Sequence, residues 1–126
     1  MAASNNYGYK RLVVGAHYGT ADFIAQRATA VIMAVYTVIL AIGLLVEPLT
    51  YEGWKSIFTF HVYTLPVGQL LATLAFLSLA WHAWIGVRDV WMDYVKSVAL
   101  RLALQVLTLL WLVGTFVYFA QYLWRI

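Results

Sequence analysis

The sequence predicts an all-α membrane protein with three transmembrane helices. Of its 126 residues, 64% are hydrophobic and only 10% are charged, whereas about 25% of residues are charged in an average globular protein. Three stretches contain no charged residue: 28–46, 56–87 and 102–124. Each is long enough to cross the hydrocarbon core of a bilayer, which takes about 20 helical residues.

The first crossing is expected to end at Glu47-Pro48, because the residue before a proline disfavours the helical conformation. The next residues, TYEGWKS, are typical of a turn. Residues 1–22 are polar and lack an apolar run long enough for the core of a signal peptide. We therefore expect an N-terminal cytoplasmic segment at 1–22 and a membrane domain at 23–126.

The second charge-free stretch is longer than one crossing requires. Pro66 suits the first turn of a helix, where its missing amide costs little, so the helix should begin between residues 61 and 66. It should end near Arg88 and be followed by a loop that contains Asp93 and Tyr94. The third stretch, 102–124, predicts one further crossing.

Basic residues predict the orientation of these helices. Three lie before the first helix and three in the second loop, whereas the first loop and the end of the chain hold one each. They are Lys10, Arg11 and Arg27 before the first helix, Arg88, Lys96 and Arg101 in the second loop, Lys55 in the first loop and Arg125 at the end. The positive-inside rule then places the N-terminus and the second loop in the cytoplasm. The basic residues do not form the clustered basic face that nucleic-acid binding requires. The sequence also shows no Arg- and Ser-rich transit segment, which favours a bacterial inner membrane.

His82 is the outstanding polar residue of the second stretch. On a helix it shares one face with other small or acidic residues, within about 40° of a line: Ala75, Ser78, Gly86, Asp89 and Asp93. Ionisable residues inside membranes are usually functional, and the small neighbours leave room for a large flat cofactor. His82 could be a haem or metal ligand, part of a proton relay, or a hydrogen-bonded interhelical group.

At the membrane depth of His82, the chain offers only this one side chain as a ligand for a haem iron or another metal. It contains no cysteine, His61 lies near the opposite membrane surface, and His17 precedes the first helix. A six-coordinate haem would therefore need its second ligand from another subunit. Arg27, at a similar depth, could extend to the headgroups or bind haem propionates.

Asp93 and Tyr94 allow two interpretations as well. They could belong to a solvated turn with an interfacial tyrosine. Alternatively, the phenol could donate a hydrogen bond to a quinone carbonyl while the carboxylate helps to deliver protons.

Several segments carry a resemblance to a known family. They are Asp22-Phe23-Ile24, Arg27-Ala28-Thr29-Ala30, Leu49-Thr50-Tyr51-Glu52 and HAWIGVRDVWMDYVKSVALRLALQ at 82–105. In these segments the chain resembles the bacterial, cytochrome b-type membrane-anchor subunit of succinate dehydrogenase, respiratory complex II.

The resemblance implies that His82 is an axial ligand of haem b and that Arg27 contacts its propionates. It also implies that Tyr94 and Asp93 bind ubiquinone. The implied partners are membrane lipid, a cytochrome b-type anchor subunit with three helices that supplies the second haem ligand, an iron-sulfur subunit, and a flavoprotein that oxidises succinate. This chain would then be a non-flavin subunit of the enzyme, without catalytic residues of its own.

Two alternatives remain from the sequence. The anchor of a fumarate reductase would use the same chemistry in the opposite direction. A non-redox three-helix assembly or transporter subunit would use His82 only for packing.

Overall fold

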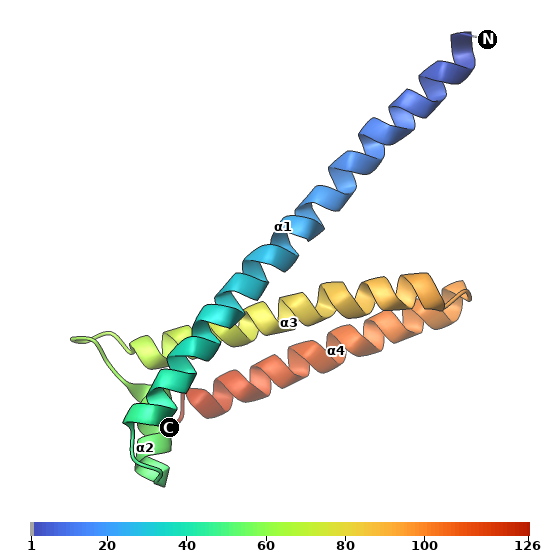
Figure 1. The fold of residues 1–126 in the computed structure, drawn as a ribbon. Helices are drawn as coiled ribbons and strands as arrows, with labels where there is room; N and C mark the ends of the chain where they lie inside the picture. Colours follow the sequence, from blue (N-terminus) through green and yellow to red (C-terminus); the bar gives the residue numbers. More distant parts are fainter. Residues whose placement is uncertain (1) are drawn as a thin grey trace.

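The computed structural model describes the backbone of residues 2–126 and the side chains of residues 19–126. Its helices are α1 (Ala2–Val46), α2 (Tyr51–Thr59), α3 (Val67–Tyr94) and α4 (Val98–Leu123), shown in Figure 1. Within this described part, three segments are long and apolar enough to cross a membrane: Gly19–Val46, Val67–Tyr94 and Val98–Leu123. The predicted all-α, multi-pass membrane architecture is therefore confirmed. The side chains of Lys10, Arg11 and His17 lie outside the described residues.

The first helix ends where the sequence predicted, at Val46. The turn that follows contains a short helix, α2, which was not predicted. The Thr50 hydroxyl caps α2 by accepting a hydrogen bond from the amide of Gly53 at 3.1 Å. A Cβ at Gly53 would lie 2.0 Å from the carbonyl oxygen of Pro48, so this close turn requires glycine.

Helix α3 continues beyond its predicted end near Arg88 and includes Tyr94. The segment from 88 to 94 contains no proline or glycine, and the amide of Val95 still donates to the Trp91 carbonyl at 3.2 Å. The charges at Arg88 mark the end of the apolar span, not the end of the helix. The prediction that Asp93 and Tyr94 lie in a loop is wrong, since both occupy the last turn of α3.

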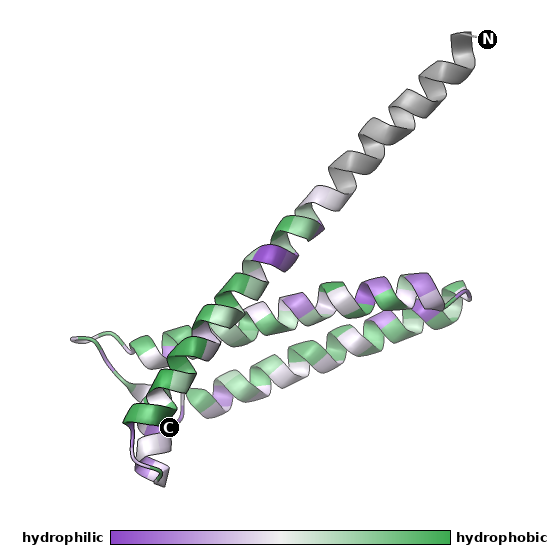
Figure 2. Cartoon of the chain, viewed as in Figure 1, coloured by the Kyte–Doolittle hydropathy of each residue, from purple (hydrophilic) through white to green (hydrophobic). Residues whose placement is uncertain are grey.

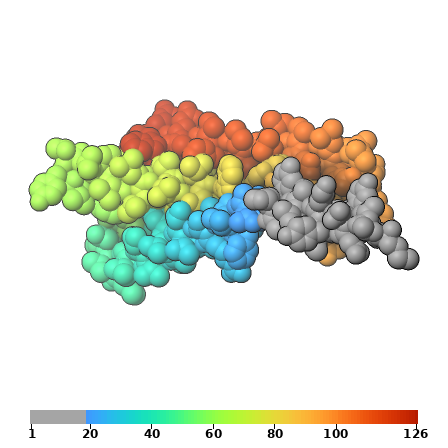
Figure 3. All heavy atoms as spheres, turned by 90° about the horizontal axis from the view of Figure 1, so that it is seen from above, coloured from blue at the N-terminus to red at the C-terminus, as the bar shows by residue number. Residues whose placement is uncertain are grey.

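Helix α3 is the central helix of the molecule. It packs against α1 on one side and runs antiparallel to α4 on the other (Figures 1 and 3). The buried residues of α3 are mostly small: Gly68, Ala72, Ala75, Ser78 and Ile85. Small side chains allow helix backbones in a membrane to approach closely, so this face of α3 sets the spacing of the bundle.

Polar side chains add further ties between α3 and α4. The Trp91 indole donates to the hydroxyl of Thr108 at 3.0 Å. At the other end, the Trp124 indole donates to the Thr73 hydroxyl at 3.1 Å. These bonds hold the two ends of the helical hairpin together.

The outer faces of α1 and α4 are apolar and exposed. Figure 2 shows hydrophobic residues along most of the described length of α1, α3 and α4. On α1, for example, Val31, Val38 and Ile42 are each more than half exposed. An apolar surface of this extent indicates contact with lipid or with another membrane chain.

Candidate functional site

His82 lies on the face of α3 that is turned toward α1. Its Nδ1 atom is 3.1 Å from the hydroxyl oxygen of Thr29 on α1. One turn further along α3, Gly86 is also on this face, because a Cβ built there would have Gln26 as its nearest neighbour at 4.0 Å. The contact with Thr29 therefore places the His82 ring at the junction of two helices.

The space that the small residues were expected to leave beside His82 is partly filled. Ala75 and Ser78 retain only 7% and 5% exposure because neighbouring parts of the chain pack against them. The open space lies instead on the other side of His82, toward Asp22 of α1 and Asp89 of α3.

This open crevice has a volume of about 450 Å³. It is lined by Gly19, Asp22, Phe23, Gln26, Arg27, Ala30, His82, Ile85 and Asp89. Two of the four predicted site residues, His82 and Arg27, thus border one space from two helices. The Arg27 guanidinium lies 5.2 Å from the centre of the Phe23 ring, a cation–π contact that holds it at the crevice.

The residues of the crevice fit a metal-bearing planar group better than a bare metal ion. In residues 19–126, no group of three or more His, Cys, Asp or Glu side chains is arranged to hold a metal ion. One imidazole and one arginine instead match the needs of a haem, namely an axial nitrogen and a cationic fork for a carboxylate. Gln26 also lines the crevice. Its side-chain oxygen is buried and has no hydrogen-bond partner among the described residues.

An ion pair that the sequence analysis did not predict involves Asp22, one of the residues that line the crevice. Arg88 of α3 donates to the carboxylate of Asp22 on α1, and Asp89 lies 3.7 Å from the same guanidinium. The sequence analysis used Arg88 only to place the end of a helix and the orientation of the chain. The opposite charges of Asp22 and Arg88, which lie at the same expected membrane depth on two adjacent spans, could have indicated this ion pair.

Asp93 and Tyr94 lie apart from the crevice. Both are exposed in the last turn of α3, and the Tyr94 side chain is 81% exposed. Twelve residues of helix separate Tyr94 from His82, which corresponds to about 18 Å along the axis. The structure therefore divides the predicted site residues between a crevice and a separate helix end.

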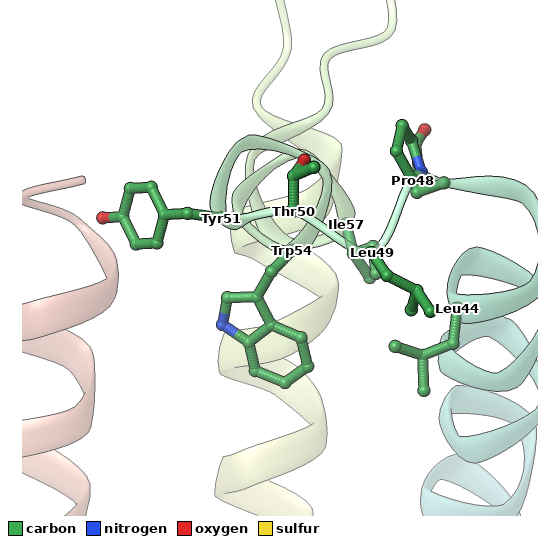
Figure 4. Close-up of a pocket in the computed structure, with 8 residues that line it drawn as sticks. Leu44, Pro48, Leu49, Thr50, Tyr51, Trp54 and Ile57 are labelled. Carbon is green, nitrogen blue, oxygen red and sulfur yellow. The ribbon is translucent and has the colours of Figure 1, made fainter.

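A second crevice, of about 380 Å³, lies at the opposite end of the molecule. It is formed where α1 turns into α2, and Figure 4 shows Trp54 between Tyr51 and the pair Leu44 and Leu49. Its lining combines apolar side chains with Glu47, Thr50 and Tyr51 and includes none of the predicted site residues. It contains no histidine or arginine, so it lacks the pair of groups that His82 and Arg27 bring to the first crevice.

Comparison with known proteins identifies a family and, among the relatives, a membrane-anchor subunit. The family described as succinate dehydrogenase/fumarate reductase transmembrane subunit matches residues 1–120. The succinate dehydrogenase hydrophobic membrane anchor subunit of Coxiella burnetii (strain RSA 493 / Nine Mile phase I) is 37% identical over 107 residues. This alignment covers 84% of the chain and 89% of the relative, and the family match includes the whole crevice.

The Asp22–Arg88 ion pair can be tested by a double-mutant cycle. Asp22→Ala and Arg88→Ala should each lower the free energy of unfolding, and the double variant should lose less than the sum. Since both side chains are partly exposed, we expect a coupling of about 0.5–1 kcal/mol, measured on the detergent-solubilised protein. Asp22→Ala combined with Lys96→Ala serves as the control and should be additive, because Lys96 is exposed on the link to α4. Additivity of Asp22 and Arg88 would contradict the coupling.

Proposed function

The chain belongs to the family of succinate dehydrogenase/fumarate reductase transmembrane subunits, and we propose that it anchors a bacterial succinate dehydrogenase, shares a haem b and helps to form the ubiquinone-reduction site. The observation that carries this proposal is the crevice in which His82 of α3 and Arg27 of α1 meet. A membrane position between helices suits a cofactor that accepts one ligand from each of two chains.

In the proposed site, the imidazole of His82 would bind the haem iron. Arg27 would hold a propionate through its planar fork, which forms two-point contacts with carboxylates. The apolar side chains of Ala30 and Ile85 line the crevice beside them and exclude water. When bound, haem b accepts and returns single electrons. A cytochrome b-type partner with three helices would supply the second ligand, because His82 is the only histidine among the residues that line the crevice.

The quinone site is proposed at the end of α3. Reduction of ubiquinone to ubiquinol takes two electrons and two protons, and the electrons come from succinate through a flavoprotein and an iron-sulfur subunit. The Tyr94 hydroxyl donates a hydrogen bond to a quinone carbonyl and so stabilises the negative charge that develops on its oxygen. Asp93, exposed beside it, exchanges protons with water.

The proposed orientation places this helix end at the cytoplasmic surface. It rests on the basic residues at the ends of the spans, of which Arg88, Lys96 and Arg101 cluster around the link from α3 to α4. The quinone residues would then face the side where the soluble subunits bind.

A fumarate reductase anchor remains the second candidate, because the matching family includes both enzymes. The same residues would then bind a quinol, whose electrons would pass through the partner subunits to fumarate. The relative rates of succinate oxidation with ubiquinone and of fumarate reduction with menaquinol separate the two. Membership in this family argues against a non-redox transporter subunit.

Haem ligation is tested by His82→Ala in the assembled complex. Loss of one axial bond should abolish or shift the low-spin b-type absorption spectrum. His61→Ala is the control, because His61 is exposed in the loop before α3, and its spectrum should equal that of the unsubstituted complex. Retained flavoprotein and iron-sulfur subunits would verify assembly. An unaltered low-spin spectrum in an assembled His82→Ala complex would reject the ligand assignment.

The role of Tyr94 is tested by Tyr94→Phe, which removes the hydroxyl and keeps the ring. A hydrogen bond that contributes about 0.5–1.5 kcal/mol, and more as charge develops on its acceptor, predicts a roughly tenfold or larger loss of quinone reductase activity. Succinate oxidation measured with a soluble dye and the haem spectrum should both persist.

The control for this substitution is Tyr63→Phe, since Tyr63 is exposed in the loop at the other end of α3. Quinone reduction in this variant should equal that of the unsubstituted complex. Full quinone reductase activity in Tyr94→Phe would make Tyr94 an ordinary interfacial residue. A parallel loss of dye activity would point to misassembly.

A further inference from the structure

The hydroxyl of Thr29 has one proton and three possible hydrogen-bond partners. Its oxygen lies 2.7 Å from the carbonyl oxygen of Ala25, 3.2 Å from that of Gln26 and 3.1 Å from Nδ1 of His82. A threonine hydroxyl has one proton to donate and two lone pairs that accept. The closest of the three is the Ala25 carbonyl oxygen, which can only accept, so we assign the hydroxyl proton to it. Toward His82, the hydroxyl then acts as an acceptor.

In this arrangement, Nδ1 of His82 carries the proton. The contact with Thr29 is a hydrogen bond only if Nδ1 is protonated and donates. The two lengths agree with this direction, because O–H···O bonds are typically about 2.7–2.8 Å and N–H···O bonds about 2.9–3.0 Å. In a neutral imidazole the other nitrogen then has a free lone pair. Nε2 of His82 is therefore the atom available to a metal.

We propose that Thr29 is a positioning residue for the haem ligand: it fixes the tautomer and the ring orientation of His82 so that Nε2 binds the iron. This inference rests on the proposed haem site. Histidines that bind metals almost always donate their second N–H to an acceptor, which orients the ring and makes the ligand more basic. Here the acceptor comes from the neighbouring helix α1, and its own orientation is fixed by the bond to Ala25.

The contact has an electronic consequence. A more basic imidazole stabilises ferric haem more than ferrous haem, so the bond to Thr29 lowers the reduction potential. Without the acceptor, the preference for the ferric state should fall. Loss of such an outer partner typically changes metal affinity by roughly tenfold or more. A tenfold change in the ferric-to-ferrous preference corresponds to an increase of about 59 mV in a one-electron potential.

The test uses the intact, haem-containing complex with three variants of this chain. Thr29→Val keeps the branched shape and removes the acceptor, whereas Thr29→Ser keeps the hydroxyl. Thr37→Val is the matched control, because Thr37 lies on the same helix, is exposed, and makes the same backbone bond, to Met33 at 2.8 Å. Redox titration gives the haem potential, and electron paramagnetic resonance of the ferric complex gives g values that depend on ring orientation.

We expect Thr29→Val to raise the potential and to shift the g values. Thr29→Ser and Thr37→Val should both match the unsubstituted complex. If Thr29→Val prevents haem incorporation, restored incorporation in Thr29→Ser supports the proposal. Loss of haem in both variants would overturn it, because the hydroxyl would then not be the deciding group.

Two further results would also overturn the proposal. One is an unchanged potential with unchanged g values in Thr29→Val. The other is an equal shift in Thr37→Val. Neither result affects the ligand assignment, which depends separately on the spectrum of the His82→Ala complex.

Discussion

A polar side chain inside a bilayer has to find its partner on a neighbouring helix, and the contact between α1 and α3 meets this requirement. Within the spans, Thr29 pairs with His82. Nearer the membrane surface, Asp22 pairs with Arg88. These contacts are possible because the small buried residues of α3 allow close packing of the helices. The crevice that contains Arg27 and His82 exists only while α1 and α3 keep this arrangement.

The continuity of α3 gives the two proposed sites a fixed separation. His82 and Tyr94 lie on one helix, so the rise per residue, and not the conformation of a loop, determines the distance between haem ligand and quinone residues. The three-residue link from α3 to α4, Val95 to Ser97, also restrains this helix end. A rigid placement of Tyr94 suits a group that must meet a quinone carbonyl as charge develops on it.

The spans and their order could be predicted from the sequence, because charge-free length is a local signal. The end of α3 could not be predicted in this way, because charged residues mark the end of the apolar stretch and a helix can continue beyond them. The pairings of Asp22 with Arg88 and of Thr29 with His82 depend on the relative rotation of two helices. That rotation follows from the packing of small residues such as Ala75 and Ser78, whose burial the pattern of residues alone did not reveal.

The central claim is that one axial bond to the haem comes from position 82 of this chain, and a ligand exchange tests it most directly. His82→Met in the assembled complex replaces imidazole with a thioether, which should raise the haem potential. Near-infrared magnetic circular dichroism of the ferric complex should then show the charge-transfer band of methionine ligation. An unaltered low-spin spectrum in the assembled His82→Met complex would contradict the claim.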